Sequence, residues 1–292
     1  MNSLQVAIIG TGRMGAGMAV RLRESGADVT AWNRTAAKAA ATGCAVAETA
    51  REAAGVADVV IVSLADDAAV LAAYDGPDGL AAGLREGTVV VESSTIDPET
   101  VRRIEPLVTG RGGVLLDGPV SGSIALVEKG QLTFMVGGPA GGVESARPVL
   151  DLLARQVFHV GELGSGEVVK LAVNTVVLAL NQALAEALVL AERAGVPRET
   201  TYEVLANSAI GSAFVSYKRA GFERPDETPV AFSLDLVAKD LDLVRQLAER
   251  VGARMPQAGT NLGVASAAVA ATLGGQDMSA VAQYLRDLSG DL

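Results

Sequence analysis

Val6-Ala7-Ile8-Ile9-Gly10-Thr11-Gly12-Arg13-Met14-Gly15 joins an apolar, β-branched run to an amphipathic stretch that begins near Met14. The glycines have the spacing G-x-G-x-x-G, directly after an expected strand and directly before an expected helix. In this pattern the first glycine permits a tight turn, the second lets a pyrophosphate approach the backbone, and the third lets the helix pack on the strand. The helix N-terminus attracts phosphate charge. The segment therefore predicts a dinucleotide site formed by Gly10, Thr11, Gly12, Arg13, Met14 and Gly15; the alternative is a glycine-rich turn without a ligand.

Short β-branched runs alternate with Ala-rich amphipathic stretches up to about residue 162. This alternation is typical of successive βαβ units around a parallel sheet. The expected strands are Val6–Ile9, Val29–Trp32, Val59–Leu64, Val89–Glu92, Val114–Asp117, Leu132–Val136 and Val157–Val160, with a helix over Gly142–Ala154. Together with the glycine pattern they predict an α/β fold over residues 1–162, a Rossmann-type domain with a doubly wound parallel sheet.

The chain from Ser165 onward has a helical pattern and no further strand pattern. A long helix is expected from Ser165 to Ala194, apolar on nearly every face and ended by Gly195-Val196-Pro197. Further helices are expected at Arg198–Asn207, Leu236–Val251, Gln257–Leu273 and Met278–Leu288. They predict an all-α C-terminal domain over residues 163–292. Because a helix that is apolar all round needs several neighbours, we also expect a homodimer or a homotetramer.

The composition argues against several classes of function. The 292 residues carry 24 Lys and Arg against 34 Asp and Glu, a net charge of −10, so nucleic acid and anionic membrane are not expected partners. Two Asn, one Gln and one Glu interrupt the longest apolar region, Leu171–Ala191, which argues against a membrane span. The single cysteine, Cys44, and the single histidine, His159, are interpreted as structural. We expect a cytoplasmic protein without a metal site or a histidine-led nucleophile.

The second expected strand ends at Trp32-Asn33-Arg34-Thr35. An NAD-selective site usually has an Asp or Glu at this point, bonded to the adenosine ribose. No acid is present here, and the Arg34 guanidinium suits a 2′-phosphate, to which arginine makes bidentate charge-assisted bonds. Asn33, Arg34 and Thr35 therefore favour NADP(H) over NAD(H) as the cofactor. The alternative is an Arg34 that only caps a loop in solvent.

Two further strand ends carry hydroxyl groups. Ser93-Ser94-Thr95-Ile96 follows the strand that ends at Glu92, and Asp117-Gly118-Pro119-Val120-Ser121-Gly122-Ser123 leaves the next strand. Both segments lie at the carboxyl end of the expected sheet, where ligands of open α/β folds bind. Hydroxyl and backbone N–H groups of the second segment could hold a carboxylate. From the residues alone, a helix N-cap and an ordinary turn remain open alternatives.

Lys170 and Asn174 lie near the start of the long apolar helix. Their i, i+4 spacing puts both side chains on one face. Burial of an amine or an amide without partners is costly, so the pair marks a candidate functional site. The alternative is a lysine that extends to solvent near the helix start.

Taken in order, these motifs resemble those of the β-hydroxyacid dehydrogenase family. The matching segments are the glycine turn Gly10–Gly15, Ser94-Thr95, Asp117–Gly122, Gly164-Ser-Gly-Glu-Val-Val-Lys170-Leu-Ala-Val-Asn174 and Lys239-Asp240. That family includes 3-hydroxyisobutyrate dehydrogenases, glyoxylate and succinic semialdehyde reductases, and relatives of 6-phosphogluconate dehydrogenase. The likeness extends over essentially the whole chain. It implies a C-terminal domain like that of 6-phosphogluconate dehydrogenase.

The resemblance also implies a role for each matching residue. Lys170 would be the catalytic lysine, with Asn174 as its partner and as a substrate ligand. Ser121, Gly122 and Ser123 would hold the substrate carboxylate, and Ser121 would help to orient the substrate for catalysis. The remaining implied residues are Leu64, Ala65, Thr95 and Lys239 for the cofactor, and Phe232 and Asp240 for the substrate. The chain departs from many members at Gly118, where they have Ala, and at Ser123, where they have Gly; the latter resembles the semialdehyde reductase branch.

We therefore expect an NADP(H)-dependent oxidoreductase that transfers a hydride between its cofactor and a small β-hydroxy acid or semialdehyde. Lys170 would act as the general acid and base. The expected substrates carry a carboxylate and are of the 3-hydroxyisobutyrate, 4-hydroxybutyrate/succinic semialdehyde or glyoxylate type. Two alternatives remain: an imine reductase of the same architecture, which usually has Asp or Tyr in place of the lysine, and a non-catalytic NADPH-binding protein.

Overall fold

The computed structural model describes residues 4–290 and forms two compact units, residues 1–170 and residues 171–292. The long helix α9, Ser165–Arg193, begins in the first unit and continues in the second.

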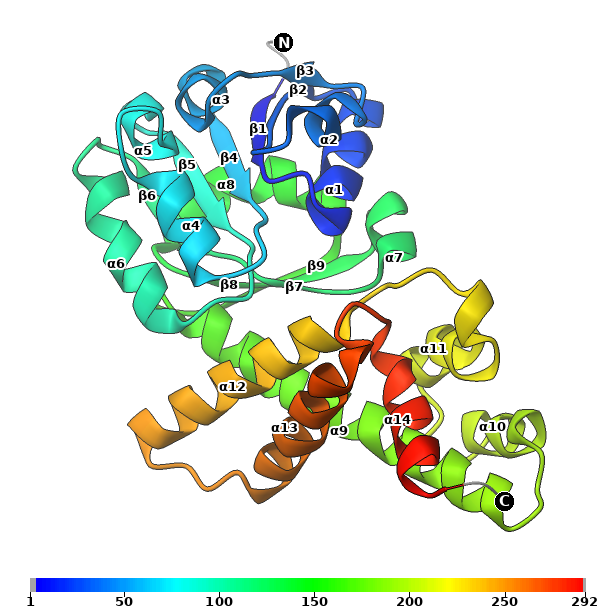
Figure 1. The fold of residues 1–292 in the computed structure, drawn as a ribbon. Helices are drawn as coiled ribbons and strands as arrows, with labels where there is room; N and C mark the ends of the chain where they lie inside the picture. The colour runs from blue at the N-terminus through cyan, green and yellow to red at the C-terminus, as the bar shows by residue number, and fades with distance from the viewer. Residues whose placement is uncertain (1–3, 291–292) are drawn as a thin grey trace. The chain divides into compact units, whose positions relative to one another are not determined.

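The first unit contains one nine-stranded sheet, with strand order β3-β2-β1-β4-β5-β6-β8-β7 and with β9 paired to β8 (Figure 1). Apolar residues fill the central strands on both faces, which is typical of a sheet covered by helices on both sides. The strands are β1 Gln5–Ile9, β2 Asp28–Trp32, β3 Ala45–Val46, β4 Val59–Val62, β5 Val89–Glu92, β6 Val114–Asp117, β7 Val120–Ser121, β8 Leu132–Gly137 and β9 Ala154–Gly161.

Strands β1 to β6 are parallel, as the sequence predicts. The sheet continues from β1 to β2 on one side and to β4 on the other, so the order reverses at β1, where the glycine turn begins. The sheet is not parallel throughout, because β8 runs antiparallel to β6 and to β7. The connection from β6 to β8 contains the two-residue strand β7 and the five-residue helix α7 (Ile124–Glu128). It is too short for a full crossover, so β8 returns in the opposite direction.

Helices cover both faces of this sheet and form two separate cores. Successive residues of a strand point to opposite faces. Ile8 accordingly packs in a core with residues of α1 and α8, whereas Ile9 packs in a core with residues of α3, α4 and α6. The doubly wound prediction is confirmed. The remaining helices of the unit are α1 Arg13–Glu24, α2 Ala36–Ala40, α3 Ala50–Val56, α4 Asp67–Tyr74, α5 Leu80–Gly83, α6 Pro98–Thr109 and α8 Ala140–Leu153.

The second unit is helical, as predicted (Figure 1). Besides α9 it contains α10 Arg198–Ala206, α11 Ala213–Glu223, η1 Pro225–Glu227, α12 Leu234–Val251, α13 Pro256–Ala268, η2 Val269–Leu273, η3 Met278–Ala280 and α14 Val281–Leu288. It has two cores, and α9 contributes to both. Leu184 packs with Tyr202 of α10 in one core, and Leu178 packs with Leu241 of α12 in the other.

Two helix predictions in this unit were incomplete. Helix α11 was not predicted, although Ser212 caps it by accepting a hydrogen bond from Val215 N at 3.3 Å, which is a recognisable start signal. The helix expected over Gln257–Leu273 ends at Ala268. A π-helical turn follows in which Thr272 has a φ of 68°, a left-handed conformation that breaks the regular helix.

Helix α9 is long and apolar enough to cross a membrane by length and composition alone. Its polar side chains nevertheless have protein partners within the second unit. Asn181 Nδ2 donates to the Met278 carbonyl at 3.0 Å, and Gln182 Nε2 donates to Glu186 Oε1 at 2.8 Å. We interpret α9 as the central helix of this unit.

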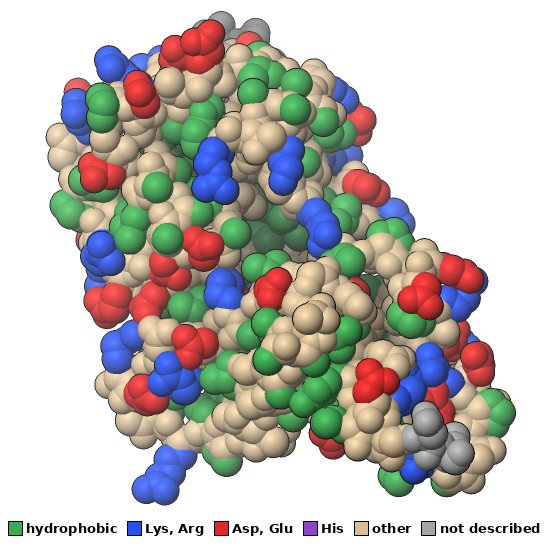
Figure 2. Space-filling view, in the orientation of Figure 1, with side chains coloured by type: hydrophobic (Ala, Val, Ile, Leu, Met, Phe, Trp, Pro, Cys, Tyr) green, Lys and Arg blue, Asp and Glu red, His purple; other side chains and the backbone are tan. Residues whose placement is uncertain are grey.

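Charged side chains of both signs cover the surface. On the face drawn in Figure 2, acidic and basic side chains are interspersed, and hydrophobic side chains also reach the surface of the helical unit. Exposed apolar residues on α9 include Val176 at 68% and Leu190 at 72% of their accessible surface.

Candidate active site

The glycine turn between β1 and α1 has the shape that a pyrophosphate requires. Gly10 has a φ of 97°, and a Cβ on it would lie 2.3 Å from the Ser63 carbonyl oxygen. A Cβ on Gly15 would lie 2.0 Å from the Gly10 carbonyl oxygen, whereas a Cβ on Gly12 would meet nothing within 4 Å. Gly10 and Gly15 are therefore needed for the close strand-to-helix turn, and Gly12 leaves its backbone open to a ligand.

The start of α1 also suits a phosphate group. Its N-cap residue is Gly12, so no side chain caps the helix, and its first turn contains no acidic residue. The first N–H groups of a helix carry partial positive charge and need acceptors from outside the helix. Arg13 is exposed beside them, whereas Met14 packs partly on the core. These residues fit a dinucleotide cofactor.

The end of β2 is tied to the glycine turn by one amide. Asn33 Oδ1 accepts a hydrogen bond from Thr11 N at 3.1 Å, and Asn33 Nδ2 donates to the Thr35 carbonyl at 3.1 Å. The Asn33 amide therefore holds the loop together. Arg34 and Thr35 are exposed, and the Arg34 guanidinium has no hydrogen bond or ion pair among residues 4–290. Of the three residues predicted to bind a 2′-phosphate, Arg34 is the one that carries a positive charge, and its side chain is exposed.

The ends of β4 and β5 are joined by buried serines. Ser94 Oγ accepts from Leu64 N at 2.8 Å, and Ser93 Oγ donates to the Gly118 carbonyl at 2.9 Å. Both serines are buried, so their hydroxyls fix the loops against one another. Thr95 is half-buried next to them, and Ala65 is exposed after Leu64. Within the segment that the sequence predicts as part of the site, the hydroxyls of both serines therefore form hydrogen bonds to the protein itself.

Glu92, which was not predicted as part of the site, is buried completely at the end of β5. Its Oε1 accepts from Ser94 N at 2.9 Å. Burial raises the pKa of its carboxyl to about 7, against the lowering effect of the hydrogen bonds to Ser94 and of the nearby Tyr74 phenol. Asp67 raises this pKa further through charge repulsion. An acid at the end of an otherwise apolar strand is the sequence signal that could have identified it.

Asp117 occupies the corresponding position at the end of β6 and was also missed as an individual residue. It is fully buried, and burial raises the pKa of its carboxyl. Asp117 Oδ1 accepts from Gly164 N at 2.8 Å, and Asp117 Oδ2 accepts from Glu167 N at 2.9 Å. The carboxyl group therefore contacts the backbone at the start of α9.

Lys170 lies in the second turn of α9, still within the first unit. Its Nζ donates to the Val120 carbonyl at 2.8 Å. Ser121 follows directly and is half-buried, and Gly122 is exposed with a φ of 147°, a backbone conformation that favours glycine. Ser123 is the residue before α7. The structure thus brings together the predicted lysine and the loop predicted to hold a carboxylate.

The second unit holds the remaining predicted polar residues in one cluster. Asn174 Nδ2 donates to Asp240 Oδ2 at 2.6 Å, and Lys239 Nζ pairs with Asp240 Oδ1 at 2.8 Å. Asn174 and Asp240 are buried, so the shared carboxylate neutralises the lysine and fixes the amide. Phe232 is half-buried, and its backbone is held by Asp277, whose Oδ2 accepts from Phe232 N at 3.3 Å.

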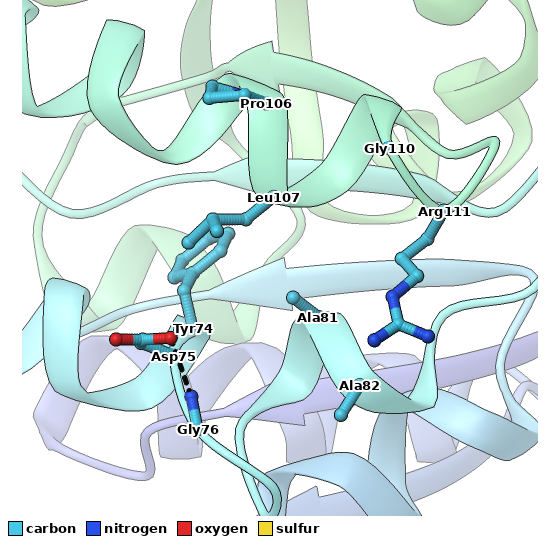
Figure 3. A pocket seen from close by; sticks show the side chains of 9 residues that line it. All are labelled: Tyr74, Asp75, Gly76, Ala81, Ala82, Pro106, Leu107, Gly110 and Arg111. Carbon is cyan, nitrogen blue, oxygen red and sulfur yellow. Dashed lines mark hydrogen bonds between the residues drawn. The ribbon is translucent and has the colours of Figure 1, made fainter.

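A separate small pocket of about 220 Å³ lies in the first unit (Figure 3). The C-terminal end of α4, helix α5 and the end of α6 form it, and the Tyr74 ring points toward Leu107 at its wall. Because α4 and α6 run back from the carboxyl ends of β4 and β5, their C-terminal ends lie at the amino ends of the strands. Ligands of open α/β sheets bind at the other edge, so the glycine turn and not this pocket is the candidate cofactor site. Residues 4–290 hold no cluster of three or more His, Cys, Asp or Glu side chains suited to a metal ion.

Two family models match almost the whole chain. The NAD-binding domain of 6-phosphogluconate dehydrogenase matches residues 5–161, and the NAD-binding region of NADP-dependent 3-hydroxyisobutyrate dehydrogenase matches residues 164–285. The two matches meet at the start of α9.

Full-length relatives agree with these matches. The chain is 32% identical over 292 residues to 2-(hydroxymethyl)glutarate dehydrogenase of Eubacterium barkeri, covering 99% of this chain and 97% of that protein. It is 31% identical over 286 residues to glyoxylate/succinic semialdehyde reductase 1 of Arabidopsis thaliana, covering 97% and 99%. The crystal structure of 3-hydroxyisobutyrate dehydrogenase from Salmonella typhimurium is similar with a TM-score of 0.88 and 31% identity, covering 97% and 100%. The chain therefore belongs to the β-hydroxyacid dehydrogenase family and is an NAD(P)-dependent oxidoreductase of that family.

Proposed function

We propose that the protein is an NADP(H)-dependent reductase or dehydrogenase that interconverts a small semialdehyde or oxoacid and the corresponding hydroxy acid. Lys170 is its general acid and base. The observation that carries this proposal is the position of the Lys170 amine, 2.8 Å from the Val120 carbonyl and next to the 121–123 loop. When bound, the cofactor supplies or accepts the hydride at the nicotinamide ring.

The preference for NADP(H) rests on the end of β2. Arg34 is exposed, and no acidic residue stands there to bond an adenosine ribose and repel a 2′-phosphate. Gly10 to Gly15 would hold the pyrophosphate, with Leu64, Ala65 and Thr95 along the rest of the cofactor.

Lys170 would hold the proton that moves to or from the substrate oxygen. In reduction its ammonium donates a proton to the carbonyl oxygen, and in oxidation its neutral amine accepts the hydroxyl proton. Such a proton transfer typically raises the reaction rate by a factor of about 10²–10⁴. Ser121, Gly122 and Ser123 offer hydroxyl and backbone N–H groups to the substrate carboxylate. In the helical unit, Asn174 and Phe232 would contact the substrate, and the carboxylate of Asp240 holds Asn174 and Lys239 in place.

The proposed substrate class rests on the names of the relatives and on the 121–123 loop. The names of the relatives, 2-(hydroxymethyl)glutarate dehydrogenase, glyoxylate/succinic semialdehyde reductase and 3-hydroxyisobutyrate dehydrogenase, all describe small hydroxy acids or aldehydes with a carboxylate. Ser123 in place of glycine favours the semialdehyde reductase type.

A panel of substrates separates this function from its two alternatives. The protein is incubated with NADPH and, in turn, succinic semialdehyde, glyoxylate, methylmalonate semialdehyde and a cyclic imine, and NADPH oxidation is followed at 340 nm. We expect oxidation with one or more of the three carboxylates. Oxidation with the imine alone would indicate an imine reductase, and NADPH binding without turnover of any compound would indicate a non-catalytic protein.

We also propose a homodimer or a homotetramer formed through the helical unit. Val176 and Leu190 are exposed apolar side chains on α9. Burial of this apolar surface against another copy would be favourable. Light scattering after size-exclusion chromatography tests this, and a monomer at micromolar concentration would contradict it.

A further inference from the structure

Asp117 is the last residue of β6 and leads into the loop that contains Val120 and Ser121. Its carboxyl oxygens accept hydrogen bonds from Gly164 N and Glu167 N, at 2.8 and 2.9 Å. A helix start has N–H groups without partners inside the helix, and a carboxyl group that accepts from them satisfies these donors and interacts favourably with the helix dipole. Asp117 thus caps α9 from a different element, 50 residues away from Glu167 in sequence.

The surroundings leave this side chain almost no freedom. A Cβ on Gly137 would lie 2.4 Å from Asp117 Oδ1, and a Cβ on Gly166 would lie 2.9 Å from Asp117 Oδ2. Asp117 itself is 0% exposed. Two glycines therefore make the space that the carboxyl group fills, and β6 and the start of α9 lie close together.

The same short segment meets α9 a second time. Three residues after Asp117, the Val120 carbonyl accepts from Lys170 Nζ at 2.8 Å. Glu167, whose N–H is bound by Asp117, lies three residues before Lys170 on the same helix. The loop 117–120 is consequently fixed to α9 at both ends, once through the helix backbone and once through the lysine amine.

We propose that Asp117 is a positioning residue: its carboxyl group docks the first turn of α9 on the end of β6 and thereby sets the Lys170 amine against the 120–123 loop. This inference rests on the proposed function of Lys170. Asp117 is fully buried, and its carboxyl group acts through the backbone N–H groups at the start of α9.

The test is a double-mutant cycle between Asp117 and Lys170. D117N keeps one acceptor oxygen but turns an NH₂ group toward a backbone N–H, so the start of α9 shifts. Misplacement of a catalytic group by about 1 Å costs about a hundredfold in rate, and we expect a loss of kcat of this order. The Kd for NADPH, measured by fluorescence, should stay within about twofold because the glycine turn is untouched.

The decisive readout is the effect of D117N in a K170A background. If Asp117 acts through the lysine, D117N lowers the residual kcat of K170A far less than it lowers that of the unchanged protein. T49A is the matched control: it removes the Thr49 cap of α3, at which Thr49 Oγ1 accepts from Glu52 N at 3.1 Å, and should leave kcat unchanged. If D117N does not fold, D117S replaces it in the double-mutant cycle, because serine is smaller and still has an oxygen that can accept a hydrogen bond.

Two other outcomes overturn different claims. A wild-type kcat in K170A would end the proposed function of Lys170, and this inference with it. A strongly impaired K170A together with a wild-type kcat in D117N, or with equal losses from D117N in both backgrounds, would overturn the role of Asp117 alone.

Discussion

Glu92→Gln should remove a pH-dependent contribution to stability that the buried carboxyl group makes. Glu92 is fully buried, and burial raises the pKa of its carboxyl from 4.5 to about 7, with a further raising effect from the charge of Asp67. The folded protein therefore holds this proton more tightly than the unfolded chain does. The resulting stabilisation is fully present below pH 4.5 and is lost as the pH rises through about 7. At about 1.4 kcal/mol per pH unit, the difference corresponds to about 3 kcal/mol.

Urea unfolding of the wild type and of E92Q at several pH values measures this difference. Glutamine stays neutral and its Oε1 can still accept from Ser94 N, so the local hydrogen bond is kept. The free energy of unfolding of E92Q, relative to that of the wild type, should rise by about 2–3 kcal/mol between about pH 5 and about pH 8. The matched control is Glu86→Gln, whose exposed side chain should give no such trend. A difference that stays flat, or one that falls with rising pH, would refute the reasoning.

Three further predictions concern the glycine turn, the cofactor and a buried ion pair. G15A should weaken NADPH binding at least tenfold by calorimetry, because its Cβ would lie 2.0 Å from the Gly10 carbonyl oxygen; an unchanged Kd would contradict the turn geometry. R34A should raise the Kd for NADPH by about 10- to 100-fold, as expected for a lost charge-assisted bond, and leave the Kd for NADH unchanged. K218A leaves Asp277 buried without its cation and should lower the free energy of unfolding by about 3–5 kcal/mol in urea titrations; a loss below about 1 kcal/mol would show that the pair contributes little.

Much of the first unit could be predicted because its signals are local. The predicted strands Val89–Glu92 and Val114–Asp117 have the observed bounds. β-branched runs, glycine turns and amphipathic stretches each specify a local conformation, and parallel βαβ units leave few ways to combine them. The antiparallel β8 could not be predicted in this way, because strand direction depends on a tertiary pairing with β6 and β7.

The candidate site was predicted less completely, because the role of a polar side chain depends on which groups it contacts in the folded protein. Lys170 and the 121–123 loop do lie together, but Asn33, Ser93 and Ser94 use their polar groups to bind the protein itself. No spacing rule connects Asp117 with Glu167 across 50 residues. Glu92 and Asp117, which are register partners on adjacent strands, do share one sequence signal: each is an acid that ends an apolar strand.

The most direct test of the account is the rate of the first turnover in K170A. The variant is preloaded with saturating NADPH and mixed rapidly with the best aldehyde of the substrate panel, and loss of NADPH absorbance gives the rate of reduction. We predict a rate about 10²–10⁴-fold lower than that of the wild type, with an unchanged Kd for NADPH. A first turnover near the wild-type rate would contradict the assignment of the proton transfer to Lys170.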